Sequence, residues 1–79
     1  MTEQEIYKMV TNILSDFSEV SIDNMRMESK LMADLELNSL DVVNIVMAFE
    51  DTFNISIPDS DLDKFKTIAD TVSYIKNHS

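Results

Sequence analysis

The chain has 79 residues, of which 15 are acidic and six are Lys or Arg, giving a net charge of −9. It has no cysteine, which excludes disulfides, thiolate metal sites and a cysteine nucleophile, and no glycine, which argues against phosphate-binding glycine loops. This charge repels nucleic acid and anionic membranes, so we expect partners with basic surfaces.

The start of the chain carries acidic side chains where a secretory signal peptide would carry positive charge and a continuous apolar run. No segment approaches the ~20 apolar residues that a helix needs to cross a bilayer. We therefore expect one domain spanning residues 1–79, monomeric, cytoplasmic and without membrane insertion.

The negative charge is concentrated in residues 31–63, which contain eight acids and no Lys or Arg. The rest of the chain is nearly neutral, because its seven acids are balanced by six basic residues. A solvated surface that keeps the protein soluble is one explanation. The concentration in one segment also indicates a docking surface.

A first helix is predicted by Thr2 and Glu5, which have the spacing of a capping box. The apolar residues that follow recur at the period of one helix face: Ile6, Met9, Val10, Ile13, Leu14 and Phe17. We expect this helix to run to about Phe17.

Residues 18–38 show no sustained period and are predicted to form a long loop, with a helical turn near residues 31–34. Loops of this length are uncommon in compact domains and are often functional. The apolar residues expected to hold the loop to the core are Ile22, Met25, Met27, Leu31 and Leu35.

A second helix is predicted from Leu40 to about Phe53, with Asn38 or Ser39 as its cap. Its β-branched residues would also suit a strand. The length of the segment and its period of 3.6 residues favour a helix.

Residues 55–57 are predicted to be extended, because Pro58 disfavours helical geometry in the residue before it. A short helix should follow over residues 59–63. A last helix is predicted from residue 67 to about residue 77 by a capping pattern and apolar residues at helical spacing. The fold class is therefore all-α: a small four-helix bundle of three main helices and one short helix, with a long loop between the first and second.

Residues 34–41 read Asp-Leu-Glu-Leu-Asn-Ser-Leu-Asp. This run resembles the signature of the acyl carrier protein family, in which Asp-Leu-Gly and one more residue precede Asp-Ser-Leu-Asp. The resemblance continues through residues 43–53, through Ile-Ser-Ile-Pro-Asp at 55–59, and through the start of the last helix at 67–75. It covers nearly the whole chain and is closest to the free-standing carriers of fatty-acid synthesis.

The resemblance implies that phosphopantetheine, derived from coenzyme A, is attached to Ser39 and carries growing acyl chains as thioesters to fatty-acid biosynthetic enzymes. A transferase performs the attachment, so the protein would be a carrier and not an enzyme, with no catalytic residue and no metal. The start of a helix suits a phosphodiester because of its unpaired N–H groups and positive dipole end. A simple helix cap is the alternative role for Ser39.

The resemblance also makes the second helix a recognition helix that docks on basic patches of phosphopantetheinyl transferases and acyl-handling synthases. Charges at such a surface mainly steer encounter and set register. The residues expected to recognise partners are Glu36, Asn38, Leu40, Asp41, Val43, Met47, Glu50, Asp51, Ile57 and Asp59.

Three positions depart from the family pattern. Asn38 replaces an aspartate, which keeps the capping ability and loses a charge. Glu36 replaces a glycine, so we expect this loop not to rely on a conformation restricted to glycine. Asn44 replaces an acid on the recognition helix. Together these changes indicate a specialised carrier or a divergent set of partners.

In this family a cavity between the helices holds the acyl chain. Methionine is flexible enough to make room for a ligand, although ordinary core or surface packing is an equal alternative. The methionines considered for this role are Met9, Met25, Met27, Met32 and Met47.

Fatty acyl chains are the first choice of cargo. Polyketide, aminoacyl or D-alanyl groups remain alternatives, because the carriers of these groups work in the same way. An independent hydrolase lacks the necessary parts, since His78 is the only histidine and lies at the end of the chain, where we expect it to be exposed to solvent.

The alternative from another class is a small acidic calcium-binding or adaptor module. The acids that follow the spacing of an EF-hand loop are Asp59, Asp61, Asp63 and Asp70. However, Lys64 occupies the position that requires glycine, and the bidentate glutamate is absent. A high-affinity calcium site is therefore not expected.

Overall fold

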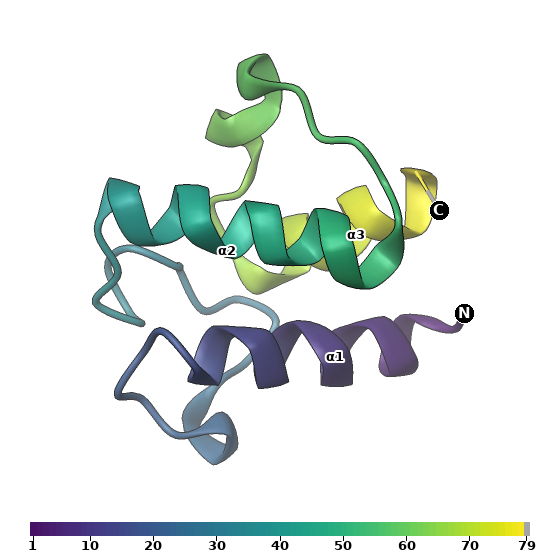
Figure 1. Ribbon diagram of the computed structural model, residues 1–79. Coiled ribbons are helices and arrows are strands. Elements are labelled where there is room, and N and C mark those ends of the chain that lie inside the picture. The colour runs from purple at the N-terminus through teal and green to yellow at the C-terminus, as the bar shows by residue number, and fades with distance from the viewer. Residues whose placement is uncertain (79) are drawn as a thin grey trace.

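The computed structural model describes residues 1–78 and contains three α-helices and two 3-10 helices, with no β-strand in this range. In chain order these are α1 (Glu3–Ser15), η1 (Ile22–Asn24), α2 (Ser39–Phe53), η2 (Asp59–Lys64) and α3 (Ile68–His78). In Figure 1, α1 and α2 lie side by side and run in opposite directions, with α3 behind α2. The predicted all-α fold is confirmed; η1 was not predicted.

The first helix begins as its sequence predicts. The Glu5 carboxylate accepts a 2.8 Å hydrogen bond from the N–H of Thr2, and the Thr2 hydroxyl accepts a 3.1 Å bond from the N–H of Glu5. The bond from the Thr2 N–H stabilises the ionised carboxylate and lowers the pKa of Glu5.

The predicted end of the first helix at Phe17 was wrong. The helix ends at Ser15, where the chain tightens, and the N–H of Phe17 bonds to the carbonyl of Leu14, three residues back. The Phe17 side chain is 38% exposed and so does not extend the buried face of α1.

The other helix bounds lie within one residue of those predicted. Asn38 is the N-cap of α2, and Asn54 ends this helix in the left-handed conformation at φ 55°. Asparagine tolerates this conformation better than most residues. At the start of α3, Thr67 and Asp70 form a reciprocal capping box.

One cluster of buried apolar side chains joins the three α-helices. Each fully buried Val, Leu, Ile or Phe contributes about 1.5–3 kcal/mol to the burial free energy. The fully buried members of this cluster on the helices include Ile6, Val10, Leu14, Ile45, Phe49, Ile68 and Ile75.

The long loop is held against the helices by some of its predicted anchors and by a turn at residues 31–34. The buried anchors are Met25, Leu31 and Leu35, whereas Ile22 and Met27 are each 38% exposed. The expectation that all five would reach the core was therefore wrong for the last two. Their positions coincide with η1 and with the turn after it, which keep that part of the loop at the surface.

Hydrogen bonds supply the remaining attachments of the loop. The Tyr7 hydroxyl of α1 donates to the carbonyl of Met25 at 2.9 Å. The backbone of the loop also pairs with the start of α3, where Lys30 and Thr67 form an isolated antiparallel bridge. These contacts fix the middle of the loop against α1 and the start of α3.

Candidate functional site

Ser39 is the first residue of α2 and is exposed to solvent. The residue before it, Asn38, caps the helix: its side-chain oxygen accepts a 2.8 Å hydrogen bond from the N–H of Asp41. The Asp41 carboxylate in turn accepts a 3.1 Å bond from the N–H of Asn38. The alternative in which Ser39 is only the helix cap was therefore wrong, because Asn38 takes that role.

The start of α2 offers a favourable place for an anion beside the Ser39 hydroxyl. The first N–H groups of an α-helix have no partner within the helix, and here Asn38 satisfies only that of Asp41. The N–H groups of Ser39 and Leu40 thus remain for a phosphate oxygen, at the positive end of the helix dipole. The residues present therefore fit a phosphodiester linked to Ser39.

The loop before this helix adopts a left-handed conformation at Glu36, where φ is 57°. Residues other than glycine can adopt this conformation, so the loop does not rely on one restricted to glycine, as expected. A residue with a Cβ atom adopts this conformation at a cost of about 1–2 kcal/mol. The burial of the neighbouring Leu35 and Leu37 offsets that cost, because both side chains reach the core.

A groove of about 720 Å³ opens beside Ser39, between the start of α2, the turn at residues 31–34, and the segment from η2 to α3. Its surface is mostly apolar. The side chains that line it include Met32, Ser39, Val42, Val43, Leu62 and Phe65. An apolar chain attached to Ser39 could therefore lie against the protein instead of in water.

The polar residues at the edge of this groove were not anticipated from the sequence: Lys30, Asp63, Lys66 and Asp70. Their charges balance one another. Lys30 reaches the groove because its backbone pairs with Thr67, a contact between segments far apart in the chain. No local sequence pattern signals such a pairing.

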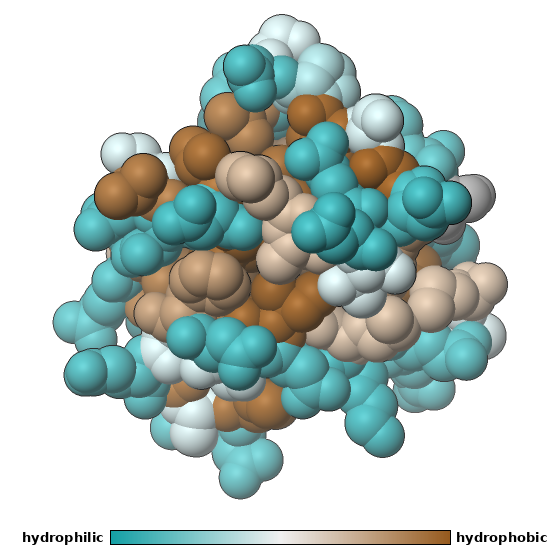
Figure 2. Space-filling view, in the orientation of Figure 1, coloured by the Kyte–Doolittle hydropathy of each residue, from teal (hydrophilic) through white to brown (hydrophobic). Residues whose placement is uncertain are grey.

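Several of the residues predicted to recognise partners lie exposed along one side of α2. The exposed fractions of Leu40, Val43 and Met47 are 68%, 38% and 57%. Positions spaced by three, four and seven residues share one face of a helix. Figure 2 shows apolar side chains gathered over the start of α2 and towards η2, with hydrophilic residues around them.

The predicted acidic contacts divide into two groups. Glu36, Asp51 and Asp59 are exposed, as is the neutral Asn44 on α2. Asp41 is only partly exposed and belongs to the capping box. It therefore has a structural role that the sequence prediction did not assign.

Glu50 and Ile57 are also engaged within the protein. The Glu50 carboxylate accepts a 2.8 Å hydrogen bond from the N–H of Ile57, which ties the extended segment after α2 to this helix. The Ile57 side chain is only 6% exposed and belongs to the core. Its contact with partners stays a prediction, for which the side chain offers little exposed surface.

The methionines considered for an acyl-binding cavity lie in different environments. Met25 is buried, Met9 is half-buried against the core, and Met32 lines the groove with 54% of its surface exposed. Met27 and Met47 are 38% and 57% exposed. For these two residues the alternative of ordinary surface placement therefore applies.

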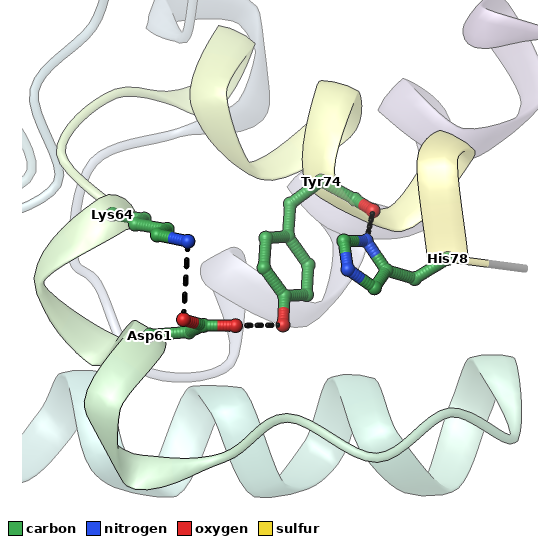
Figure 3. Close-up of polar contacts among 4 residues, drawn as sticks. All are labelled: Asp61, Lys64, Tyr74 and His78. Atoms are coloured by element: carbon green, nitrogen blue, oxygen red, sulfur yellow. Dashed lines mark hydrogen bonds and ion pairs between the residues drawn. The ribbon is translucent and has the colours of Figure 1, made fainter.

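A polar cluster joins η2 to the last helix on another part of the surface (Figure 3). The Tyr74 hydroxyl donates a 2.6 Å hydrogen bond to Asp61, which also pairs with Lys64 at 3.1 Å. The bond to Asp61, together with burial, raises the pKa of Tyr74 to about 12. The same bond, with a smaller effect of Lys64, lowers the pKa of Asp61.

This cluster contains His78, considered for an independent hydrolase, and Asp61, considered for a calcium-binding module. His78 stacks on the Tyr74 ring at 4.0 Å and bonds to the carbonyl of the same residue, so it is ordered in α3. Asp61, one of the acids with the spacing of an EF-hand loop, accepts a hydrogen bond from Tyr74 and forms an ion pair with Lys64. Within residues 1–78, no group of three or more His, Cys, Asp or Glu is placed to hold a metal ion.

Comparison with known proteins assigns the chain to a family. The family described as phosphopantetheine attachment site matches residues 9–75. The chain belongs to this family. The phosphopantetheine cofactor and the carrier function predicted from the sequence are confirmed by this match and by the relatives that follow.

The chain is 38% identical over 78 residues to the acyl carrier protein of Lactobacillus acidophilus, covering 99% of this chain and 98% of that protein. It is 44% identical over 72 residues to the acyl carrier protein of Campylobacter lari, covering 91% and 94%. Among solved structures it resembles the acyl carrier protein of Enterococcus faecalis, described for its high thermal stability. The TM-score is 0.85 at 30% identity, with both chains fully covered.

None of the helices formed by residues 1–78 is both long enough and apolar enough to cross a membrane.

Proposed function

We propose that Ser39 is the residue to which phosphopantetheine is attached, and that the protein carries acyl chains of fatty-acid synthesis on the resulting arm. The observation that carries this proposal is the position of Ser39: an exposed hydroxyl at the first residue of α2, beside unpaired N–H groups and next to an apolar groove. The hydroxyl is accessible to an enzyme, and the groove is placed to receive what the arm carries.

The attachment is a phosphoryl-group transfer from coenzyme A. The Ser39 oxygen forms a bond to the phosphorus that bears the pantetheine arm, and the bond from this phosphorus to the 3′,5′-bisphosphorylated adenosine breaks. The hydroxyl proton passes to a base of the transferase, and adenosine 3′,5′-bisphosphate leaves. The thiol at the end of the arm then supplies the sulfur of the thioester, which the chain cannot provide because it contains no cysteine.

The surface around Ser39 supports a role as a substrate of other enzymes and not as a catalyst. Exposed Leu40 and Met47 offer apolar contacts, while Glu36, Asp51 and Asp59 offer negative charge. We infer that transferases and synthases with basic surfaces dock here, in the cytoplasm, on a single monomeric domain of residues 1–79. Charge of this kind raises the rate of encounter without making release slow, which suits a shuttle.

Intact-protein mass spectrometry tests the proposal. The protein is incubated with coenzyme A and a phosphopantetheinyl transferase of broad specificity, and we expect the mass of one phosphopantetheine to be added. Ser39→Ala should gain no mass. Ser56→Ala is the matched control, since Ser56 is exposed but lies in the extended segment after α2, and it should be modified like the wild type.

Two results would contradict the assignment. One is a lack of mass gain with several transferases. The other is a gain that persists in Ser39→Ala, which would place the attachment on another residue.

A further inference from the structure

The floor of the groove beside Ser39 is formed by two residues. Among the side chains that line the groove, only Val42 and Phe65 are buried, with exposed fractions of 8% and 4%. The others are exposed or half-buried and form its walls and rim. An apolar chain that enters from Ser39 therefore ends against Val42 or Phe65.

Phe65 separates the groove from the aromatic part of the core. Its ring centroid lies 6.4 Å from that of Phe49, which is fully buried, and 4.9 Å from that of Tyr74. Neither Phe49 nor Tyr74 lines the groove. The Phe65 ring thus stands between the groove on one side and two further rings on the other.

The two floor residues differ in the backbone that carries them. Val42 lies within α2, so its backbone is fixed by the helix. Phe65 follows η2, at φ −91° and ψ 69°, in the short link before α3. Behind it, Tyr74 is held in place by its hydrogen bond to Asp61. The ring of Phe65 is therefore prevented from moving back into the core, although its own backbone is not helical.

We propose that Phe65 sets how much of an acyl chain this carrier can shelter, by closing the inner end of the groove. Once an acyl chain reaches Phe65, the groove holds as many of its carbons as it can. The remaining carbons stay in solvent or with the partner enzyme. This inference rests on the proposed function of Ser39, since it concerns the cargo attached there. A smaller side chain at position 65 should extend the groove towards Phe49 and Tyr74.

The experiment compares chains of increasing even length attached to the intact protein. The transferase loads acyl-phosphopantetheine from saturated acyl-coenzyme A onto wild-type protein, Phe65→Leu and Phe65→Met, and mass spectrometry confirms the loading. The folding equilibrium constant of each product is then measured by urea denaturation. Each methylene group that enters the groove raises this constant by up to about fourfold.

We expect the folding constant of the wild type to rise with chain length and then to reach a plateau, where the chain meets Phe65. In Phe65→Leu the plateau should move to longer chains. Phe65→Met should shift it less, because methionine is flexible and fills much of the same space. Using two mild substitutions keeps the test decisive if one variant folds poorly.

Phe53→Leu is the matched control. Phe53 is also buried, and its ring centroid also lies 6.4 Å from that of Phe49, but it does not line the groove. This variant should be less stable at every chain length and reach its plateau at the same length as the wild type.

The outcomes separate this inference from the proposed function. If all proteins load but Phe65→Leu, Phe65→Met and wild type reach their plateaus at the same length, Phe65 does not set the limit. Stability that is independent of chain length in every protein would show that the chain does not enter the groove, which also overturns the inference. A failure of all the proteins to load would contradict the proposed function itself, and with it this inference.

Discussion

The Tyr74 hydroxyl and the Asp61 carboxylate are joined by a 2.6 Å hydrogen bond that links α3 to η2. The bond raises the pKa of Tyr74 to about 12 from its ordinary 10.0, and lowers that of Asp61 below its ordinary 3.8. Because η2 supplies Leu62 and Asp63 to the wall of the groove, this contact also fixes that wall. A single side-chain pair therefore connects the stability of the fold with the shape of the candidate site.

We predict that Tyr74→Phe lowers stability only while Asp61 is ionised. The folded state binds the Asp61 proton less tightly and the Tyr74 proton more tightly than the unfolded chain does. The contribution of the contact is thus complete between about pH 4 and pH 10. It is lost as the pH falls through the lowered pKa of Asp61, and as the pH rises through about 12. Urea denaturation of both proteins across the acid range measures the difference.

Tyr7→Phe is the control for this prediction. The Tyr7 hydroxyl donates to the carbonyl of Met25, and a backbone carbonyl does not titrate in the acid range. Its loss should therefore lower stability by a similar amount at neutral and acid pH. A Tyr74→Phe difference that stays constant down through the usual range of Asp pKa values would contradict the role of Asp61.

Glu36→Gly should stabilise the protein by about 0.5–1 kcal/mol. Glycine removes the cost of a Cβ atom in the left-handed region, and only part of this gain is lost to the greater freedom of glycine in the unfolded chain. Asn54→Gly is the matched comparison, because Asn54 has φ 55° and asparagine tolerates this conformation. Its gain in unfolding free energy should be smaller. Equal gains at the two positions would argue against strain at Glu36.

The helices could be predicted because their signals are local. Capping boxes place the two partners three residues apart, and the apolar period needs no knowledge of the rest of the chain. Both signals were recognised at the start of α1, whereas at α2 Asn38 was considered as a cap and its pairing with Asp41 was not predicted. The run around Ser39 was recognisable for the same reason.

A cavity for the acyl chain was expected from the family resemblance, but the residues that form the groove could not be predicted, because its floor and edge are brought together by contacts between distant segments. Lys30 meets Thr67 only in the folded protein, and Phe65 becomes a floor residue only when η2 turns back beside α2. The burial of Ile57 was not predicted either; its N–H bonds to the Glu50 carboxylate seven residues earlier. An alternation of exposed and buried residues in such short links leaves no distinctive pattern in the sequence.

The replacement of aspartate by Asn38 should leave the helix cap intact. We predict that Asn38→Ala lowers the free energy of unfolding by about 1 kcal/mol, because the N–H of Asp41 loses its acceptor. Asn38→Asp should be as stable as the wild type or more stable by about 0.3–1 kcal/mol, since a negative charge is favourable at a helix N-terminus. Urea denaturation at low salt measures both. A loss of stability in Asn38→Asp would contradict the capping geometry.

Glu50 should matter for stability through its acceptor oxygen. In Glu50→Ala the N–H of Ile57 is left without its partner, at a cost of about 1–3 kcal/mol. Glu50→Gln keeps an oxygen that can accept this bond and should be destabilised less. Asp51→Ala, at an exposed neighbouring position, should change stability by less than about 0.5 kcal/mol. Similar stability of all three variants, measured by urea denaturation, would show that the bond is unimportant.

Leu40 should contribute to partner binding and not to folding. Its side chain is 68% exposed, so Leu40→Ala should change the free energy of unfolding by less than about 0.5 kcal/mol. It adjoins Ser39, where a transferase must approach, and the few interface residues whose truncation costs more than about 1 kcal/mol cluster near the centre of an interface. We therefore expect kcat/KM for phosphopantetheine transfer to fall about fivefold or more. Ile22→Ala removes an exposed apolar side chain from η1 instead, and should leave kcat/KM unchanged. Equal kcat/KM values for Leu40→Ala and the wild type would mean that the transferase does not use this face of α2.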